Sequence, residues 1–352
     1  IDDLIELGKK YGSMEINKEN TENKDKKKPI GTLYEYNGKV YPVNLEIIVK
    51  LVEPLTKLKN MIGLYKIKDS VLDMILYYLQ GFEKTNNNML HTVIEGPPGV
   101  GKTELGRIIG EIYVALGIIK GGKFKIARRT DLVGEYLGHT AQKTQRLIDD
   151  ADGGVLFIDE AYSLGSREGK DSFSKECIDT LNQNLSENKR RFVCIIAGYP
   201  NELETCFFSH NPGLSRRFPF RYRIDSYDEN EMKDIFMKKL KDTKWKLDMD
   251  TNNNTQKDNK NNTNSDNNPN TQSIDLYVKN FFKENRDKFI NYGGDIDNLI
   301  IACKFCHSRR MIGKHPKYRK IMTTIDIQNG FKKFLRNKKE PSHNELINNM
   351  FI

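Results

Sequence analysis

Five short strand-like segments recur through the middle of the chain, at 92–95, 123–127, 154–158, 191–197 and 219–224. Segments with helical spacing of apolar residues separate most of them. The run Val155–Ile158 is apolar at every position, which is typical of a strand covered on both faces in a parallel sheet. This alternation predicts a three-layer α/β domain with a mostly parallel sheet, over 58–225.

Beyond residue 225 the pattern contains only helical periodicity. We expect helices at 228–242, 274–289, 295–311 and 324–336. They predict a small all-helical domain over 226–338, followed by a C-terminal tail at 339–352. Residues 251–272 contain ten Asn and no Val, Leu, Ile, Met or aromatic residue, so we expect a disordered insertion, bounded at 248–273.

The first 57 residues follow a weaker pattern and are expected to form an N-terminal extension. Residues 13–29 are mostly polar, which favours a flexible linker. The dipeptide Asn37-Gly38 is a strong signal for a two-residue turn, so it predicts a small hairpin at 31–42.

A phosphate-binding loop is predicted where the first strand ends, because Gly96-Pro97-Pro98-Gly99-Val100-Gly101-Lys102-Thr103 joins that strand to a helical segment. Glycines let backbone N–H groups turn toward phosphates, a Lys in this position reaches the β- and γ-phosphates, and the hydroxyl that follows can hold Mg²⁺. The sequence therefore predicts binding of a nucleoside triphosphate with Mg²⁺. The expected contacts are Pro98, Gly99, Val100, Gly101, Lys102, Thr103 and Glu104.

Two carboxylates, Asp159 and Glu160, end the strand at 154–158. Ligands of α/β sheets bind at the carboxyl ends of the strands. Asp159 can accept a water bound to Mg²⁺, and Glu160 can polarise the water that attacks the γ-phosphate. An acidic pair in this position is often a helix cap or a solvated turn, but the phosphate loop favours the catalytic interpretation.

Composition indicates a soluble globular protein, with 352 residues of which 37% are hydrophobic and 30% charged. No apolar run approaches the roughly 18 residues of a membrane span, so we expect no membrane partner. The first residues lack a signal-peptide pattern, and a cytoplasmic, nuclear or organelle-stromal compartment is expected. Because the chain begins with Ile rather than Met, the possibility of a removed targeting segment stays open.

Charge and cysteine patterns leave further alternatives open. The net charge is +9, and residues 301–339 hold twelve Lys or Arg against Asp326 alone. Such a stripe can bind phosphates or an acidic protein, or it can be an ordinary solvated helix face. Cys303 and Cys306 precede His307 in a string that also occurs in metal and haem sites, but a shared helix face explains the same spacing.

With these motifs in this order, residues 62–310 resemble an AAA+ ATPase. More narrowly, they resemble the branch that contains the red-type Rubisco activases and stage V sporulation protein K. Four strings support the narrower resemblance: Asp131-Leu132-Val133-Gly134-Glu135-Tyr136-Leu137-Gly138-His139-Thr140, Phe157-Ile158-Asp159-Glu160-Ala161-Tyr162, Ile196-Ala197-Gly198-Tyr199 and Asn211-Pro212-Gly213-Leu214-Ser215-Arg216-Arg217-Phe218.

The resemblance implies an ATP-dependent homo-oligomeric ring, usually a hexamer, with ATP sites between subunits. Arg217 matches the arginine finger that reaches the neighbouring site, and Arg216 is its partner or substitute. Tyr136, flanked by glycines, matches a loop that lines the central pore and grips a polypeptide client. The alternative for Tyr136 is packing against its own subunit. Ile62 and Gly63 resemble the segment that contacts adenine.

Two positions depart from the wider family. Tyr199 occupies the sensor position at the end of the fourth strand, where a polar Asn is common, although the narrower branch also has Tyr there. Ile296 stands where a lid arginine is expected. Arg309 and Arg310 lie about four turns further along and are doubtful substitutes.

The leading hypothesis is therefore a ring-forming Mg²⁺-dependent ATPase that remodels a protein client through a central pore. A nucleic-acid machine such as a helicase loader or clamp-loader subunit, using the basic lid, is the alternative. A third hypothesis is a nucleotide-gated scaffold with little turnover, which Glu160 and Arg217 argue against.

Overall fold

The computed structural model describes residues 1–19, 33–36, 39–42, 44–82, 89–136, 138–165, 171–187, 192–211, 213–249 and 269–338. The predictions for the tail at 339–352 and for most of the insertion lie outside these residues. The chain divides into two compact units. One comprises Ile1–Pro97 with Gly101–Asp225, and the other comprises Pro98–Val100 with Ser226–Ile352.

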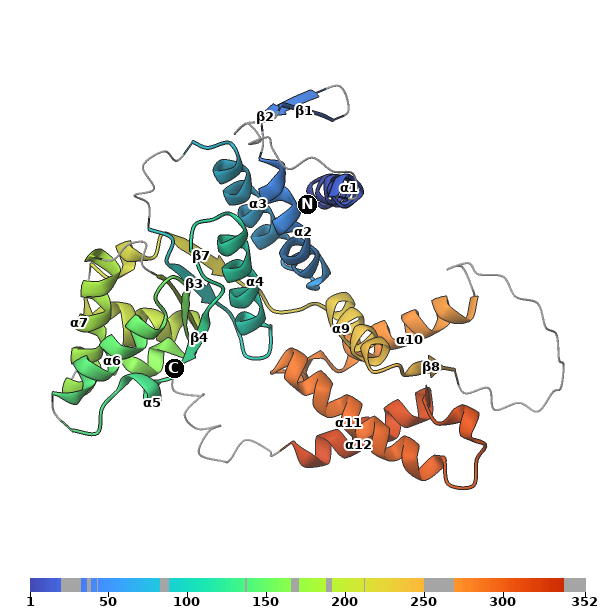
Figure 1. Ribbon diagram of the computed structural model, residues 1–352. Coiled ribbons are helices and arrows are strands. Elements are labelled where there is room, and N and C mark those ends of the chain that lie inside the picture. The colour runs from blue at the N-terminus through green and yellow to red at the C-terminus, as the bar shows by residue number, and fades with distance from the viewer. Residues whose placement is uncertain are drawn as a thin grey trace. The chain divides into compact units, whose positions relative to one another are not determined.

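A five-stranded parallel sheet forms the centre of the first unit (Figure 1). Its strands run in the order β4-β5-β6-β3-β7. All five predicted strands are confirmed to within two residues. Their bounds are β3 Thr92–Glu95, β4 Phe124–Ala127, β5 Val155–Ile158, β6 Val193–Gly198 and β7 Phe220–Arg223.

Helices cover both faces of the sheet, as the uninterrupted apolar run of β5 predicts. Successive strand residues point to opposite faces. Phe157 accordingly packs beneath Gly106 of α4, Lys102–Ala115, whereas Leu156 and Ile158 belong to a core shared with α6, His139–Asp150, and α7, Ser172–Glu187. Because all five strands are parallel, the loops after β3, β4, β5 and β6 meet at one edge.

The N-terminal extension is part of this unit, which corrects two predictions. Helix α1, Asp2–Glu19, includes residues 13–19 that were expected in a flexible linker. Helix α2, Leu45–Asn60, runs through the expected boundary between residues 57 and 58, and it packs on both α1 and α4. The apolar stripe of α2 explains this, because Leu51, Leu55 and Leu58 are fully buried.

The strands of the predicted N-terminal hairpin are confirmed. They are β1, Leu33–Tyr36, and β2, Lys39–Pro42, which pair antiparallel. Helix α3, Tyr65–Leu79, follows α2. Several short elements complete the first unit: α5 Arg129–Leu132, η1 Ala161–Leu164, α8 Pro200–Glu202, η2 Leu203–Phe207, η3 Phe208–His210 and η4 Ser215–Arg217.

The second unit is mainly helical, as predicted. Its elements are α9 Glu229–Asp242, α10 Pro269–Glu284, η5 Arg286–Lys288, α11 Tyr292–Arg310, η6 Pro316–Tyr318 and α12 Thr324–Asn337. A capping box at Asp228 begins α9 where the sequence changes from strand to helix spacing. Helices α11 and α12 approach closely at Gly330, where an added Cβ would lie 2.5 Å from the sulfur of Cys303.

Two details of this unit differ from the expectation. A short parallel pair, β8 Lys246–Asp248 and β9 Ile321–Thr323, adds a sheet that the helical pattern did not indicate. The insertion bounds at 248–273 are wrong at both ends, because Asp248 is in β8 and residues 269–273 are in α10. Strand pairing between segments more than seventy residues apart has no local signature, which explains the first difference.

Within the described residues, no helix combines the length and the apolar character that crossing a bilayer requires.

The contact between Gly106 and Phe157 provides a test of the packing between α4 and the sheet. A Cβ at Gly106 would lie 2.5 Å from the Phe157 ring, so Gly106→Ala should lower the free energy of unfolding by about 1–3 kcal/mol. Gly122→Ala is the matched control, because nothing lies within 4 Å of its Cβ position. Chemical denaturation measures both; equal stability of the two variants would contradict the packing described.

Candidate nucleotide-binding site

Lys102 is held at the start of α4 by the loop that precedes it. Its Nζ donates hydrogen bonds to the carbonyl oxygens of Gly96, at 2.9 Å, and Pro97, at 2.8 Å. Gly101 has φ of 86°, a left-handed conformation that suits glycine and lets the chain turn into the helix. The ammonium group therefore stays beside the loop rather than extending into solvent.

The electrostatic surroundings of Lys102 combine burial with two carboxylates. Burial lowers the pKa of Lys102, whereas Asp159 and Glu160 oppose that shift by favouring the charged form. The same three residues were predicted to handle phosphate and metal. The structure thus places the lysine that follows β3 close enough to the two carboxylates that follow β5 for their charges to interact.

The tip of the phosphate loop, Pro98–Val100, belongs to the second compact unit. Within that unit, the N–H of Gly293 donates to the carbonyl of Gly99 at 3.1 Å, and the hydroxyl of Tyr227 donates to the carbonyl of Val100 at 2.9 Å. Gly99 has φ of 72°, and a Cβ there would lie 2.0 Å from the carbonyl oxygen of Asn291. Only glycine fits this position.

Asp159 and Glu160 follow β5 in a constrained turn. The backbone N–H of Asp159 donates to the carbonyl of Ala127 at 3.0 Å, which continues the ladder between β4 and β5. Glu160 adopts φ of 52° and ψ of 46°, a left-handed conformation that is uncommon for a residue with a side chain. Its N–H donates to Oδ1 of Asp159 at 3.1 Å, and its side chain is exposed. Such local strain is typical of functional turns.

The ring of Tyr199 lies beside the ammonium group of Lys102. The Nζ of Lys102 lies 5.0 Å from the centre of the Tyr199 ring, within the range of a cation–π interaction. Tyr199 also stacks on Tyr162, with ring centres 5.3 Å apart. The sequence predicted a role for Tyr199 but none for Tyr162. The only sequence signal for Tyr162 was the presence of an aromatic residue two positions after Glu160.

The segment expected to contact adenine lies near the phosphate loop. The Cε of Met61 is 3.4 Å from the position of a Cβ on Gly101. Gly63 is buried with φ of 68°, and Leu64 also has a positive φ, so this turn is tightly constrained. Ile62 and Gly63 therefore directly follow a residue whose side chain lies beside Gly101 of the loop. Glu104, in the first turn of α4, is exposed.

Arg217 and Arg216 differ in their surroundings. The Nε of Arg217 donates to the hydroxyl of Ser186 at 2.8 Å, and its Nη1 donates to the carbonyl of Gly213 at 3.4 Å. Arg216 is exposed. Arg217 is thus anchored to α7 and to the preceding loop of its own chain. Nothing in the sequence pattern indicated Ser186.

Tyr136 projects from the first unit, with 66% of its surface exposed. The Tyr136 ring lies edge-on to the His139 ring, with ring centres 5.5 Å apart. His139 is the first residue of α6. Gly138 has φ of 83° at the start of the same helix. The aromatic side chain is consequently not buried against its own domain.

A buried apolar residue occupies the position where the lid arginine was expected. Ile296 is completely buried in α11. Arg310 pairs with the buried carboxylate of Asp326 at 2.7 Å, whereas Arg309 is exposed. The hydrogen bonds from Arg310 and His307 help to hold the pKa of Asp326 below its usual range despite burial.

The oxygen donors at the site suit Mg²⁺, which prefers hard ligands and keeps several waters. They are the Thr103 hydroxyl and the Asp159 carboxylate, both half-buried. Within the described residues, the second oxygen of Asp159 makes no hydrogen bond. In the part of the chain that the structure describes, no group of three or more His, Cys, Asp or Glu could hold a metal ion by itself.

The parallel sheet, phosphate loop and acidic strand end define a P-loop nucleotide-binding protein. The sequence profile of the ATPase family associated with various cellular activities (AAA) matches residues 92–224. A cfxQ-like protein of Acanthamoeba polyphaga mimivirus is 41% identical over 88% of this chain and 71% of its own length. The chain belongs to the AAA family of ATPases.

Other relatives match shorter segments. Stage V sporulation protein K of Bacillus subtilis is 42% identical over 47% of this chain and 50% of its own length. The ESX-1 secretion system protein EccA1 of Mycolicibacterium smegmatis is 38% identical over 53% of this chain and 33% of its own length. Among solved structures, the FIGL-1 AAA domain in complex with ADP is similar in fold, with a TM-score of 0.50 and 16% identity over 83% of this chain and 88% of that chain.

Glu160 and Lys102 can be separated by substitution. Glu160→Gln should retain ATP binding but lower the steady-state hydrolysis rate at least about 10²-fold, because it removes only the carboxylate that can polarise water. Lys102→Ala, as the contrasting variant, should lose ATP binding. Fluorescent-nucleotide titration and phosphate release measure the two effects. Unchanged hydrolysis in Glu160→Gln would exclude the assigned role.

Proposed function

We propose that this protein is a ring-forming, Mg²⁺-dependent ATPase that remodels a protein client. The observation that carries the proposal is the arrangement of the Lys102 ammonium, the Asp159 and Glu160 carboxylates and the Tyr199 ring at one edge of the sheet. Membership of the AAA family agrees with this chemistry.

ATP binding at this edge would draw Lys102 from two neutral carbonyl acceptors to the charged oxygens of the β- and γ-phosphates. Charge-assisted hydrogen bonds are stronger than neutral ones, so the exchange favours the nucleotide. Bound Mg²⁺ supplies charge neutralisation at the phosphates, with Thr103 and Asp159 as its protein partners. Glu160, exposed at the end of β5, orients and polarises the attacking water.

The active form is proposed to be a homo-oligomer, in the first instance a hexameric ring. Arg217 or Arg216 then supplies positive charge to the γ-phosphate bound by the adjacent subunit. The hydrogen bonds from Nε and Nη1 hold one edge of the Arg217 guanidinium against its own chain, whereas Nη2 makes no hydrogen bond to any residue that the structure describes. Exposed Arg216 is available beside it.

The proposed client is a polypeptide. Exposed Tyr136 offers a flat apolar ring that contacts any chain without reading its sequence. Tyr136 lies in the connection between β4 and α6, shortly before α6 begins. Movement of that loop during the ATP cycle would pull on the client.

A nucleic-acid machine is the second candidate, favoured by a basic surface on the second unit. Arg309, Lys332, Lys333 and Arg336 line a pocket of about 440 Å³ on α11 and α12. Phosphate binding there would weaken steeply with salt. None of these four residues is among the predicted nucleotide contacts, and the two candidates predict different stimulating ligands.

The arginine role can be tested by mixing subunits. Arg217→Ala should leave ATP affinity nearly unchanged and lower hydrolysis by roughly 10³-fold, because a trans arginine acts mainly on the transition state. Lys102→Ala and Arg217→Ala chains, when co-assembled, should regain part of the activity at interfaces where both residues are intact. Co-assembly without recovery would place Arg217 in its own site or outside catalysis.

The client class can be tested through stimulation of hydrolysis. An unfolded casein-like protein should accelerate ATP hydrolysis, whereas single-stranded DNA should not. Tyr136→Ala should abolish the stimulation while changing the free energy of unfolding by less than about 0.5 kcal/mol, as expected for an exposed side chain. Stimulation by DNA alone would favour the nucleic-acid candidate. A strongly destabilised Tyr136→Ala would show that the ring packs on its own subunit.

A further inference from the structure

The turn that carries Glu160 depends on contacts from outside the turn. Glu160 has φ of 52°, and such a left-handed conformation in a residue with a side chain persists only where the surrounding structure holds it. Inside the turn, the backbone N–H of Ser163 donates to the carbonyl of Glu160 at 2.8 Å. On one side, Nη1 of Arg129 in α5 donates to the carbonyl of Ser163 at 2.6 Å. The Glu160 side chain is exposed, so its direction follows from how this turn is attached to the sheet.

Tyr162, two residues after Glu160, attaches the turn to the end of β6. An added Cβ at Gly198 would lie 2.9 Å from Cδ1 of Tyr162, so the aromatic ring occupies the space that a side chain at Gly198 would fill. The same ring stacks on that of Tyr199, with an angle of 22° between the ring planes. Tyr162 therefore contacts the last residue of β6 and the residue that follows it.

The end of β6 is in turn joined to the phosphate loop. The backbone N–H of Gly96, the first residue of that loop, donates to the carbonyl of Gly198 at 3.2 Å. The centre of the Tyr199 ring lies 5.0 Å from Nζ of Lys102. Tyr162 thus packs on a segment that contacts both the start of the loop and its ammonium group.

The Tyr162 hydroxyl is not suited to act as a base. Burial raises the pKa of Tyr162, and the Glu160 carboxylate and hydrogen bonding to Tyr199 act in the same direction. The hydroxyl is therefore protonated at neutral pH. A contribution of this residue to hydrolysis comes from where its ring packs rather than from proton transfer.

We propose that Tyr162 is a positioning residue for ATP hydrolysis: its ring holds the turn after β5 against the end of β6 and thereby fixes the Glu160 carboxylate relative to Lys102. Tyr162 acts through Glu160 and does not itself touch the nucleotide. Misplacement of a catalytic group by about 1 Å can lower a rate by up to about 10²-fold. The inference rests on the proposed function, in which Glu160 polarises the attacking water.

Tyr162→Leu should lower kcat for ATP hydrolysis about tenfold, because Glu160 loses its position. The Kd of a fluorescent ATP analogue should change less than about twofold, since Glu160 acts on the water and not on nucleotide binding. Tyr162→Phe keeps the ring and should retain kcat to within about twofold. In a Glu160→Gln background, Tyr162→Leu should cause no further loss in the single-turnover rate, because the group that it positions is already missing.

Tyr77→Leu is the matched control. Tyr77 lies in α3 and its ring meets that of Tyr78 edge-on, with ring centres 5.5 Å apart. Neither residue is among the predicted nucleotide contacts, so kcat should change less than about twofold. Melting temperatures check that each variant is folded, and Tyr162→Met takes the place of Tyr162→Leu if the latter unfolds at the assay temperature.

Four outcomes would each overturn the proposal. They are an unchanged kcat in folded Tyr162→Leu, equal losses in Tyr162→Leu and Tyr162→Phe, a loss of ATP affinity as large as the loss of kcat, and a further tenfold loss in the Glu160→Gln background. Unchanged hydrolysis in Glu160→Gln alone would instead count against the proposed function on which the inference rests.

Discussion

The packing of α4 against the parallel sheet is the contact on which the nucleotide site depends. Gly106 permits that approach, because its missing side chain leaves room for the ring of Phe157. Helix α4 begins at Lys102, so the depth at which it packs also determines the position of the lysine relative to the ends of β3 and β5. A larger residue at Gly106 would displace the binding group together with the helix.

Charge balance at the sheet edge favours the positively charged form of Lys102 although this side chain is partly buried. Burial lowers the pKa of Lys102, while the Asp159 and Glu160 carboxylates favour its charged form. Two backbone carbonyls satisfy its donors, and the ring of Tyr199 faces the ammonium group. These neutral partners are weaker than phosphate oxygens, so the arrangement keeps the cation in place without competing strongly with a nucleotide.

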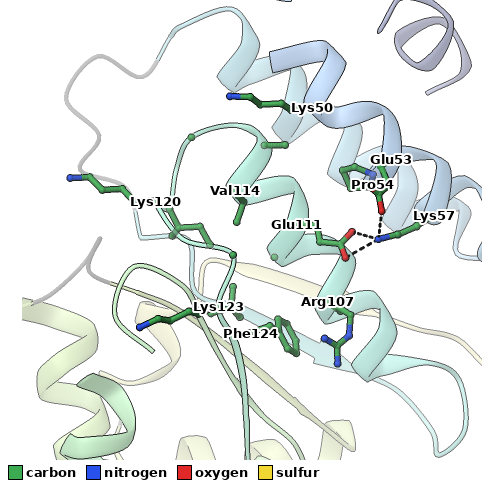
Figure 2. A pocket seen from close by; sticks show the side chains of 16 residues that line it. Lys50, Glu53, Pro54, Lys57, Arg107, Glu111, Val114, Lys120, Lys123 and Phe124 are labelled. Carbon is green, nitrogen blue, oxygen red and sulfur yellow. Dashed lines mark hydrogen bonds and ion pairs between the residues drawn. The ribbon is translucent and has the colours of Figure 1, made fainter. Parts of the chain in front are cut away.

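The N-terminal extension has a structural role in the first unit and supplies one wall of a second pocket, which is also lined by α4 and the loop before β4 (Figure 2). Its helix α2 buries Leu51, Leu55 and Leu58 and packs on α4. Lys57 of the same helix neutralises Glu111 of α4, so the two acidic residues of the pocket are already paired. Helix α4 thereby connects the sheet edge that carries Lys102, Asp159 and Glu160 with a basic pocket formed partly by the extension.

The sequence alone determined the sheet and its parallel character, and it predicted the candidate nucleotide-binding residues, because apolar runs and the Gly-Lys-Thr loop are local signals. Ser186 beneath Arg217, Tyr162 against Tyr199 and the pairing of β8 with β9 could not be predicted, since each joins segments whose proximity only the tertiary structure decides. The start of α10 was misplaced for a related reason: polar residues at 269–273 give no apolar periodicity, yet they continue a helix whose later turns bury Val278 and Phe282. Apolar burial elsewhere in a helix can thus extend it over residues whose own pattern indicates a loop.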